Sequence, residues 1–398
     1  MTSVDPTGTV TSPRGFRAGG TYAGIKTYGD GKLDLGLLVS DVPCTAAAVY
    51  TTSRFRAPAI EVDRDHLADG RAQAVAVNSG VANAGTGARG LADARRFAAL
   101  AAARLGIDVR DVLVCSTGVI GEFLPLDKIE AALPAIELSA EGGMAFSRAI
   151  MTTDTRPKHG AVRVGPYTIG GCAKGAGMIH PNMATMLAFL TTDAPVARAF
   201  LERALREAVD RSFNLVSVDG DTSPSDTVIV LANAMAGGEP IAEGHPLAGS
   251  FQESLEALCI HLAKAIARDG EGATKLIEFT VRGAAEEADA RRLVRLLSTS
   301  YLLKSAVHGA DPNWGRIVAV IGRSGARFEE ESVRVALCGT EVFAGGRPTE
   351  CDLGRVAEAM RGPEVTIEVD LGAGSASATG WGCDLSADYV AINADYHT

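Results

Sequence analysis

The sequence predicts a mixed α/β fold in which helices and strands form separate layers. Runs with strand character recur along the 398 residues, and helical patterns lie between them. No segment repeats with a period of about 20 to 50 residues and none has low complexity, which argues against solenoid and disordered classes. The length is enough for two or three domains with large buried cores.

Five short apolar runs are the clearest strand candidates. In chain order they are Leu35–Ser40, Ala74–Val77, Val112–Cys115, Thr227–Leu231 and Val365–Val369, and a further buried-strand pattern covers Met186–Leu190. Five segments have helical patterns: Leu91–Leu105, Val196–Ser212, Phe251–Ala267, Ala288–Leu297 and Leu353–Arg361. The third has the most complete end signals, since Ser250 with Glu253 forms a capping box and Gly270 follows shortly after its end.

Composition and charge exclude several classes of protein. The net charge of −10 argues against a nucleic-acid partner, and no run reaches the roughly 18 apolar residues of a membrane span. Met1–Phe16 is polar and lacks the apolar core of a signal peptide, so we expect a soluble cytoplasmic protein without a membrane partner. The seven cysteines never form a C-x-x-C pair and the histidines are scattered, so we expect reduced thiols and no metal site.

A glycine-rich segment imitates a dinucleotide-binding fingerprint. Gly85–Gly90 matches G-x-G-x-x-G, follows the candidate strand that ends at Val77, and opens the helix from Leu91. In that fingerprint the first glycine ends the strand, whereas here the residues from Asn78 to Ala84 intervene. We interpret the segment as a loop before a helix, and a nucleotide-binding α/β protein stays as an alternative.

Thr185 lies where a chain could cleave itself. The stretch from Lys174 to Thr185 is rich in Gly, with Pro and Asn, and it leads directly into the buried-strand pattern. If the Ala184–Thr185 bond breaks, Thr185 carries both a hydroxyl nucleophile and an α-amine base, whose reference pKa is about 7.7–8.0. Taken alone, an ordinary strand threonine is the stronger interpretation of this residue.

Three other segments add polar groups suited to a catalytic site. Thr117 and Gly118 follow a candidate strand and could face a developing oxyanion. Glu271 lies in a glycine-rich turn after a helix, and Lys174 lies among glycines with little apolar surface to cover. Each of these is more often a solvated loop residue than a ligand when it stands alone.

Several long motifs in the same order resemble the ornithine acetyltransferase family, also called glutamate N-acetyltransferase or ArgJ. The resemblance covers almost the whole chain, from Gly15 to Thr398. The motifs are Thr152–Thr155, Ala173–Thr185, Asp219–Ser223, Asp269–Lys275, Gly309–Arg316, Gly382–Leu385 and Asn393–Thr398.

The resemblance implies a precursor that cleaves itself into residues 1–184 and residues 185–398, the second chain beginning with the nucleophile Thr185. It implies that the two fragments stay together, as an α2β2 assembly. It also implies a layered αββα sandwich like that of N-terminal-nucleophile hydrolases but with different connectivity, plus a smaller C-terminal α/β region. The implied reaction is a ping-pong transfer of acetyl from N-acetyl-ornithine to glutamate in cyclic arginine biosynthesis.

Residue roles follow from the same resemblance. Thr117 and Gly118 match the oxyanion-hole pair, and no cofactor is implied, although acetyl-CoA could serve as a second acetyl donor. The positions matching substrate contacts are Thr152, Lys174, Thr185, Glu271, Asn393 and Thr398. Lys174 and Glu271 complement the α-carboxylate and α-nitrogen of an amino acid.

Two alternatives share the same nucleophile. One is a hydrolase or aminopeptidase with an N-terminal threonine, which would pass the acyl group to water. The other is a paralogue that serves a specialised biosynthetic cluster, because Val81, Gly85, Ser223–Asp226 and Val307–His308 depart from the family pattern.

Overall fold

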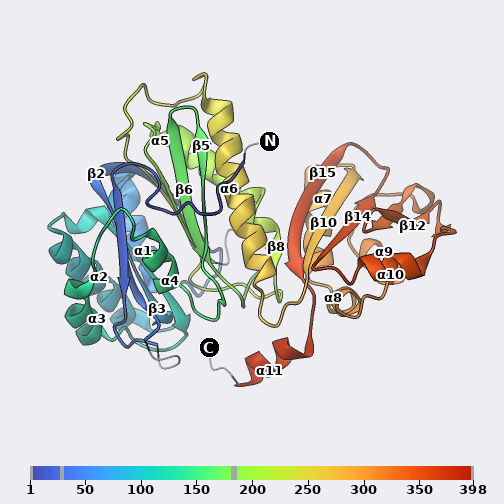
Figure 1. The fold of residues 1–398 in the computed structure, drawn as a ribbon, viewed down its shortest axis with the longest axis horizontal. Helices are drawn as coiled ribbons and strands as arrows, with labels where there is room; N and C mark the ends of the chain where they lie inside the picture. The colour runs from blue at the N-terminus through green and yellow to red at the C-terminus, as the bar shows by residue number, and fades with distance from the viewer. Residues whose placement is uncertain (1–2, 27–30, 181–185, 396–398) are drawn as a thin grey trace.

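Two β-sheets organise the protein in the computed structural model, which describes residues 3–26, 31–180 and 186–395 (Figure 1). The first sheet has the strand order β4-β3-β2-β9-β7-β6-β5, with β1 paired to β2. Its strands are β1 (Phe16–Thr21), β2 (Leu35–Tyr50), β3 (Arg71–Val81), β4 (Val112–Val119), β5 (Lys158–Val164), β6 (Tyr167–Lys174), β7 (Leu187–Thr192) and β9 (Thr227–Ala232).

The long strand β2 joins two halves of this sheet, one with β1, β3 and β4 and the other with β9, β7, β6 and β5. Its first part, Leu35–Val39, pairs with β1 and β3, and its last part, Thr45–Tyr50, pairs with β9. The register on β3 shifts between Val39 and Cys44, so the strand is irregular where it passes from one half to the other. The two halves can therefore fold over and face each other.

Alternating side chains of the two half-sheets fill three separate cores. Leu38 and Val75 of one half share a core with Phe189 and Ile229 of the other, and Phe146 of α4 (Gly143–Ala149) packs edge-to-face on Phe189. The outer faces are covered by helices on both sides. These helices are α1 (Pro58–His66), α2 (Gly87–Leu105) and α3 (Leu126–Ala132) on one face, and α5 (Arg198–Asp210) and α6 (Ala248–Arg268) on the other. This arrangement is the predicted αββα sandwich.

The second sheet forms the smaller C-terminal region, with the order β13-β12-β11-β14-β10-β15-β8. Its strands are β8 (Val216–Ser217), β10 (Leu276–Ala284), β11 (Arg334–Leu337), β12 (Thr340–Ala344), β13 (Arg347–Pro348), β14 (Glu364–Asp370) and β15 (Ala376–Cys383). The accompanying helices are α7 (Glu287–Ser298), α8 (Tyr301–His308), α9 (Trp314–Gly322) and α10 (Leu353–Ala359). After β15 the chain leaves this region and forms α11 (Ala387–Asp395), which ends near the lower edge of the sandwich (Figure 1).

The predicted strands and helices are all present, although several differ in length from the prediction. Strand β2 continues ten residues beyond the predicted end at Ser40, and β4 continues past Cys115 to Val119. The capping box at Ser250 is wrong, because α6 already begins at Ala248 and no side chain caps it at Leu247.

In chain order, the point of proposed cleavage falls between two neighbouring strands of the first sheet rather than between domains. Strand β6 ends at Lys174 and its antiparallel neighbour β7 begins at Leu187, so residues on both sides of 184/185 build one sandwich. Within the described ranges, no helix is long and apolar enough to cross a membrane.

Candidate active site

One cavity brings together the described residues that the sequence singles out. Its empty space, including the part open to solvent, is about 700 Å³. Six predicted site residues line it: Thr117, Gly118, Thr152, Lys174, Glu271 and Asn393. Met186, the residue that follows Thr185 in the sequence, also lines it. Ala184, Thr185 and Thr398 lie outside the described residues.

Thr117 and Gly118 lie at an irregularity in the pairing of β3 with β4. The parallel register shifts where Gly80 faces Gly118, and Val81 pairs with both Thr117 and Val119. Gly118 has a φ of 129°, and a Cβ there would lie 2.3 Å from the backbone carbon of Gly80. A bulge of this kind turns backbone groups away from the regular ladder, and here it does so beside the cavity.

Lys174, the last residue of β6, extends its ammonium toward the same irregularity. Its Nζ donates to Thr117 Oγ1 at 3.3 Å, and the residue is only 7% exposed. Burial lowers the pKa of Lys174 from its ordinary value, while the negative charge of Asp154 opposes that effect. A negatively charged ligand group in the cavity would restore a favourable partner for this buried cation.

Glu271 reaches the cavity from the segment after α6 and meets the C-terminal helix there. Asn393 Nδ2 of α11 donates to Glu271 Oε2 at 2.8 Å, and the Glu271 amide donates to the Ala176 carbonyl at 2.9 Å. A Cβ at Gly177 would lie 2.4 Å from the Glu271 carboxylate, so only glycine allows this close approach. The carboxylate is thereby held between two segments that are distant in sequence.

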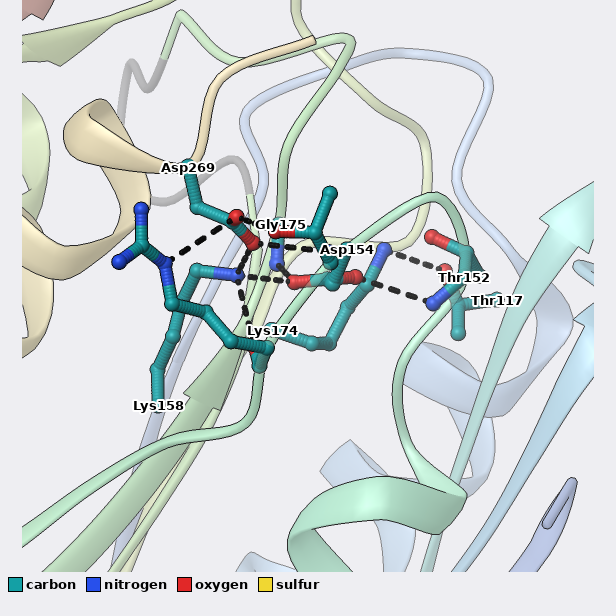
Figure 2. A network of polar contacts seen from close by, with 9 residues as sticks. Thr117, Thr152, Asp154, Lys158, Lys174, Gly175 and Asp269 are labelled. Carbon is teal, nitrogen blue, oxygen red and sulfur yellow. Dashed lines mark hydrogen bonds and ion pairs between the residues drawn. The ribbon is translucent and has the colours of Figure 1, made fainter. Parts of the chain in front are cut away.

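Thr152 is placed by its backbone rather than by its side chain. Its amide donates to Asp154 Oδ2 at 3.0 Å, and the other oxygen of that carboxylate accepts the Gly175 amide at 2.6 Å. Asp154 therefore ties the Thr152 loop to the end of the strand that carries Lys174 (Figure 2).

The residues that lead into the 181–185 segment are held by a buried carboxylate. Asp219 accepts the amides of Met178 at 2.6 Å and Ile179 at 2.9 Å, and Met178 has a φ of 54°. These two bonds stabilise an uncommon backbone conformation just before His180. Sequence reasoning did not give Asp219 this role, although the motif Asp219–Ser223 contains it.

His180 is held in a neutral hydrogen-bonded form. Arg295 Nη2 donates to its Nε2 at 2.7 Å, which leaves Nδ1 to donate to Ser217 Oγ at 3.2 Å. Burial and the adjacent Arg295 charge lower the pKa of His180 to about 4. These contacts indicate a structural role for His180 rather than that of a general base.

Hydrogen bonds between Asn83 and the glycine-rich segment at 85–90 stabilise a local turn. Strand β3 runs to Val81, four residues further than predicted, yet Gly85 still does not end the strand. Thr86 Oγ1 donates to the Asn83 carbonyl at 2.7 Å, and Asn83 Nδ2 donates to the Gly90 carbonyl at 2.8 Å. The turn differs from that of the dinucleotide fingerprint, in which the first glycine follows the strand directly.

Several cavity residues were not predicted as site residues. Besides apolar groups such as Ile120 and Met178, the lining includes Ser223, Ser225 and Asp226. These polar residues belong to the segment that departs from the family pattern, and that departure was the available signal.

The comparison with known proteins decides the family. The sequence model of the ArgJ family matches residues 17–398. The chain belongs to the ArgJ family.

Relatives in the ArgJ family match this chain over almost its full length. The "Arginine biosynthesis bifunctional protein ArgJ" of Dehalococcoides mccartyi is 50% identical, covering 100% of this chain and 99% of that protein. The protein of the same name from Symbiobacterium thermophilum is 51% identical, covering 98% and 99%. A crystal structure of the ArgJ protein from Bacillus halodurans is 41% identical with a TM-score of 0.51, and it covers 52% of this chain and 98% of its own.

Proposed function

We propose that this protein is an acetyltransferase of arginine biosynthesis, which moves the acetyl group of N-acetyl-ornithine to glutamate. Membership of the ArgJ family supports the reaction class, and the relatives are named for arginine biosynthesis. The observation that carries the proposal is the convergence of Thr117, Gly118, Thr152, Lys174, Glu271 and Asn393 on one cavity.

The nucleophile of the proposed reaction is Thr185, after cleavage of the Ala184–Thr185 bond. Its hydroxyl oxygen attacks the acetyl carbonyl, its α-amine takes the hydroxyl proton, and that proton passes to the amine of departing ornithine. The α-amine of glutamate then attacks the acetyl-threonine ester, which forms N-acetyl-glutamate and regenerates the hydroxyl. Thr117 and the Gly118 amide stabilise the oxyanion in both steps.

Charge complementarity supports the shared use of one site by both amino acids. Lys174 provides a buried cation for an α-carboxylate, and Glu271 provides a carboxylate for the α-nitrogen. Thr152, Asn393 and Thr398 complete the proposed substrate contacts. Because ornithine and glutamate share this end, one set of residues serves donor and acceptor in turn.

Cleavage divides the chain into residues 1–184 and 185–398, and we propose that the fragments stay together in an α2β2 assembly. The interleaving of strands β6, β7 and β9 in one sheet supports a stable association after cleavage. The solved Bacillus halodurans chain, matched over 98% of its length by 52% of this one, is about half as long. The seven cysteines, all unpaired, suit the reducing cytoplasm that we propose as its compartment.

We also propose acetyl-CoA as a second acetyl donor. The word "bifunctional" in the names of the relatives motivates this proposal. The test is formation of N-acetyl-glutamate from acetyl-CoA and glutamate in the absence of N-acetyl-ornithine. If no product forms above the level of a Thr185→Ala control, acetyl-CoA is excluded as a donor.

The deciding experiment combines intact masses with an acetyl-transfer assay. We expect the purified protein to give two fragments, the second beginning at Thr185, and Thr185→Ala to give one uncut chain without activity. A full-length wild type with full activity would refute the mechanism. If acetyl release from N-acetyl-ornithine is as fast without glutamate as with it, the protein is a hydrolase instead.

A further inference from the structure

We propose that a buried ion network of Asp154, Lys158 and Asp269 is a positioning device that fixes Thr152, Lys174 and Glu271 relative to one another. This inference rests on the proposed function, because it assigns the network a part in holding the amino-acid substrates. None of its three members is among the residues that line the cavity.

The centre of the network is the ammonium group of Lys158 at the start of β5. Its Nζ donates to Asp154 Oδ1 at 2.5 Å and to Asp269 Oδ2 at 2.6 Å, so it bridges two carboxylates (Figure 2). The three side chains are at most 2% exposed. Charge-assisted bonds between buried groups have little freedom to rearrange, since no water replaces a lost partner.

Each carboxylate of the network holds a segment that carries a substrate-contacting residue. Asp154 accepts the Thr152 and Gly175 amides, which places Thr152 and, through the adjacent backbone, Lys174. Asp269 lies two residues before Glu271 and accepts the Thr155 amide at 3.1 Å. Thr155 Oγ1 also donates to Asp269. The distance between Glu271 and Thr152 is therefore set through Lys158.

The positive and negative charges of the buried network compensate one another. Asp154 and Asp269 are negative, while Lys158 and the nearby Lys174 are positive, and the partly exposed Arg156 guanidinium reaches Asp269 at 3.4 Å. Burial opposes ionisation of Asp154, but the Lys158 and Lys174 charges hold its pKa well below the usual range. The same ammonium that joins the segments thus keeps Asp154 ionised as an acceptor for both amides.

The network also spans the proposed cleavage point. Asp154 and Lys158 precede residue 184 and Asp269 follows it, so the bond from Lys158 to Asp269 would join the two fragments. Substrate contacts from both fragments are thereby kept in one geometry after the covalent connection is lost.

The test uses a mild variant series, because removing the Lys158 charge would leave two buried carboxylates without compensation. Asp269→Asn weakens the bridge, Thr155→Val removes one donor to Asp269 without changing charge, and Thr155→Ser restores the hydroxyl. Lys264→Met is the matched control. Lys264 lies on α6, the helix that ends directly before Asp269, and forms a 2.7 Å ion pair with Glu278, but it does not line the cavity.

Two readouts separate positioning from simple stabilisation. We expect Asp269→Asn and Thr155→Val to raise KM for both N-acetyl-ornithine and glutamate by about 10- to 100-fold, as misplaced binding groups do. Thr155→Ser and Lys264→Met should stay within about threefold of wild type. If the network only stabilises the fold, Asp269→Asn and Thr155→Val would have a lower melting temperature and an unchanged KM. That result would overturn the proposal.

Calorimetric titration with ornithine keeps this test independent of turnover. We expect the Kd of ornithine to weaken in parallel with KM in Asp269→Asn and Thr155→Val. If the wild type binds ornithine but transfers no acetyl group, the proposed function is refuted. The Kd values of the variants would still show whether the network positions the binding residues. If Asp269→Asn does not fold, Thr155→Val decides, and an unchanged Kd in that variant refutes the inference.

Discussion

Replacing Gly118 by alanine tests whether the irregular β3–β4 pairing orients an oxyanion donor. The added Cβ would lie 2.3 Å from the backbone carbon of Gly80, whereas Cβ atoms essentially never come within 3.0 Å of such an atom. The backbone must therefore move by about 0.7 Å, the difference between these two distances. Loss of one oxyanion donor costs about 10²- to 10³-fold in kcat, or about 2.7–4 kcal/mol. We expect Gly118→Ala to fall in that range.

Gly121→Ala is the matched control for the backbone strain at this position. Gly121 also has a positive φ, 87°, but no atom lies within 4 Å of a Cβ placed there. It should lose on the order of 1–2 kcal/mol of stability through the unfavourable φ and keep kcat within about threefold. Activity is measured per mole of cleaved chain, so that slow self-cleavage is not counted as slow transfer. A Gly118→Ala protein with wild-type kcat would refute the reasoning.

Two further substitutions test the site, and a third tests Asp63, a buried carboxylate of α1. Lys174→Met should raise KM for both substrates by about 10- to 100-fold, because it removes a charged hydrogen-bond donor, and initial-rate kinetics would show whether only one substrate is affected. Asn393→Ala should raise KM by about tenfold, since Glu271 loses its 2.8 Å partner; an unchanged KM would mean that the pair is not engaged with substrate. Burial raises the pKa of Asp63 well above its usual value, so its contribution to stability is complete below about pH 4 and is lost as pH rises toward the folded-state pKa. Asp63→Asn should therefore gain stability over wild type as the pH rises from about 4 to about 8 in thermal or urea denaturation, and a gap that does not change with pH would contradict this.

Local sequence patterns located six of the fifteen described strands and five of the eleven described α-helices, but not their ends. The run from Ser40 to Pro43 contains Asp41 and Pro43, which normally end a strand, yet β2 continues to Tyr50 because its second part pairs with β9. In β4, Gly118 has poor strand propensity, and the pairing with β3 extends the strand through it nevertheless. Tertiary pairing therefore overrode local preference at both places.

The start of α6 shows the opposite error, because the sequence contains a strong capping signal at Ser250 that does not cap the helix. Ser250 and Glu253 have the spacing of a capping box, but the helix begins at Ala248, after the turn formed by His245 to Leu247. His245 Nδ1 accepts the Leu247 amide at 3.1 Å, so a side chain before the helix satisfies a backbone donor there. A four-residue motif does not reveal that an earlier turn already starts the helix.

The site residues came from motifs, whereas their mutual arrangement required the fold. Thr152–Thr155 and Asp269–Lys275 stood out as separate segments, and nothing in either one indicates that Thr155 bonds to Asp269 across 114 positions. That contact depends on where α6 ends, because Asp269 is the residue directly after Arg268. One residue more or less in this helix would rotate the following side chain by about 100° and shift it by about 1.5 Å, which would move the carboxylate out of reach of Lys158. Helix ends are assigned from sequence only to within a few residues, so the buried network, unlike the individual site residues, could not have been predicted.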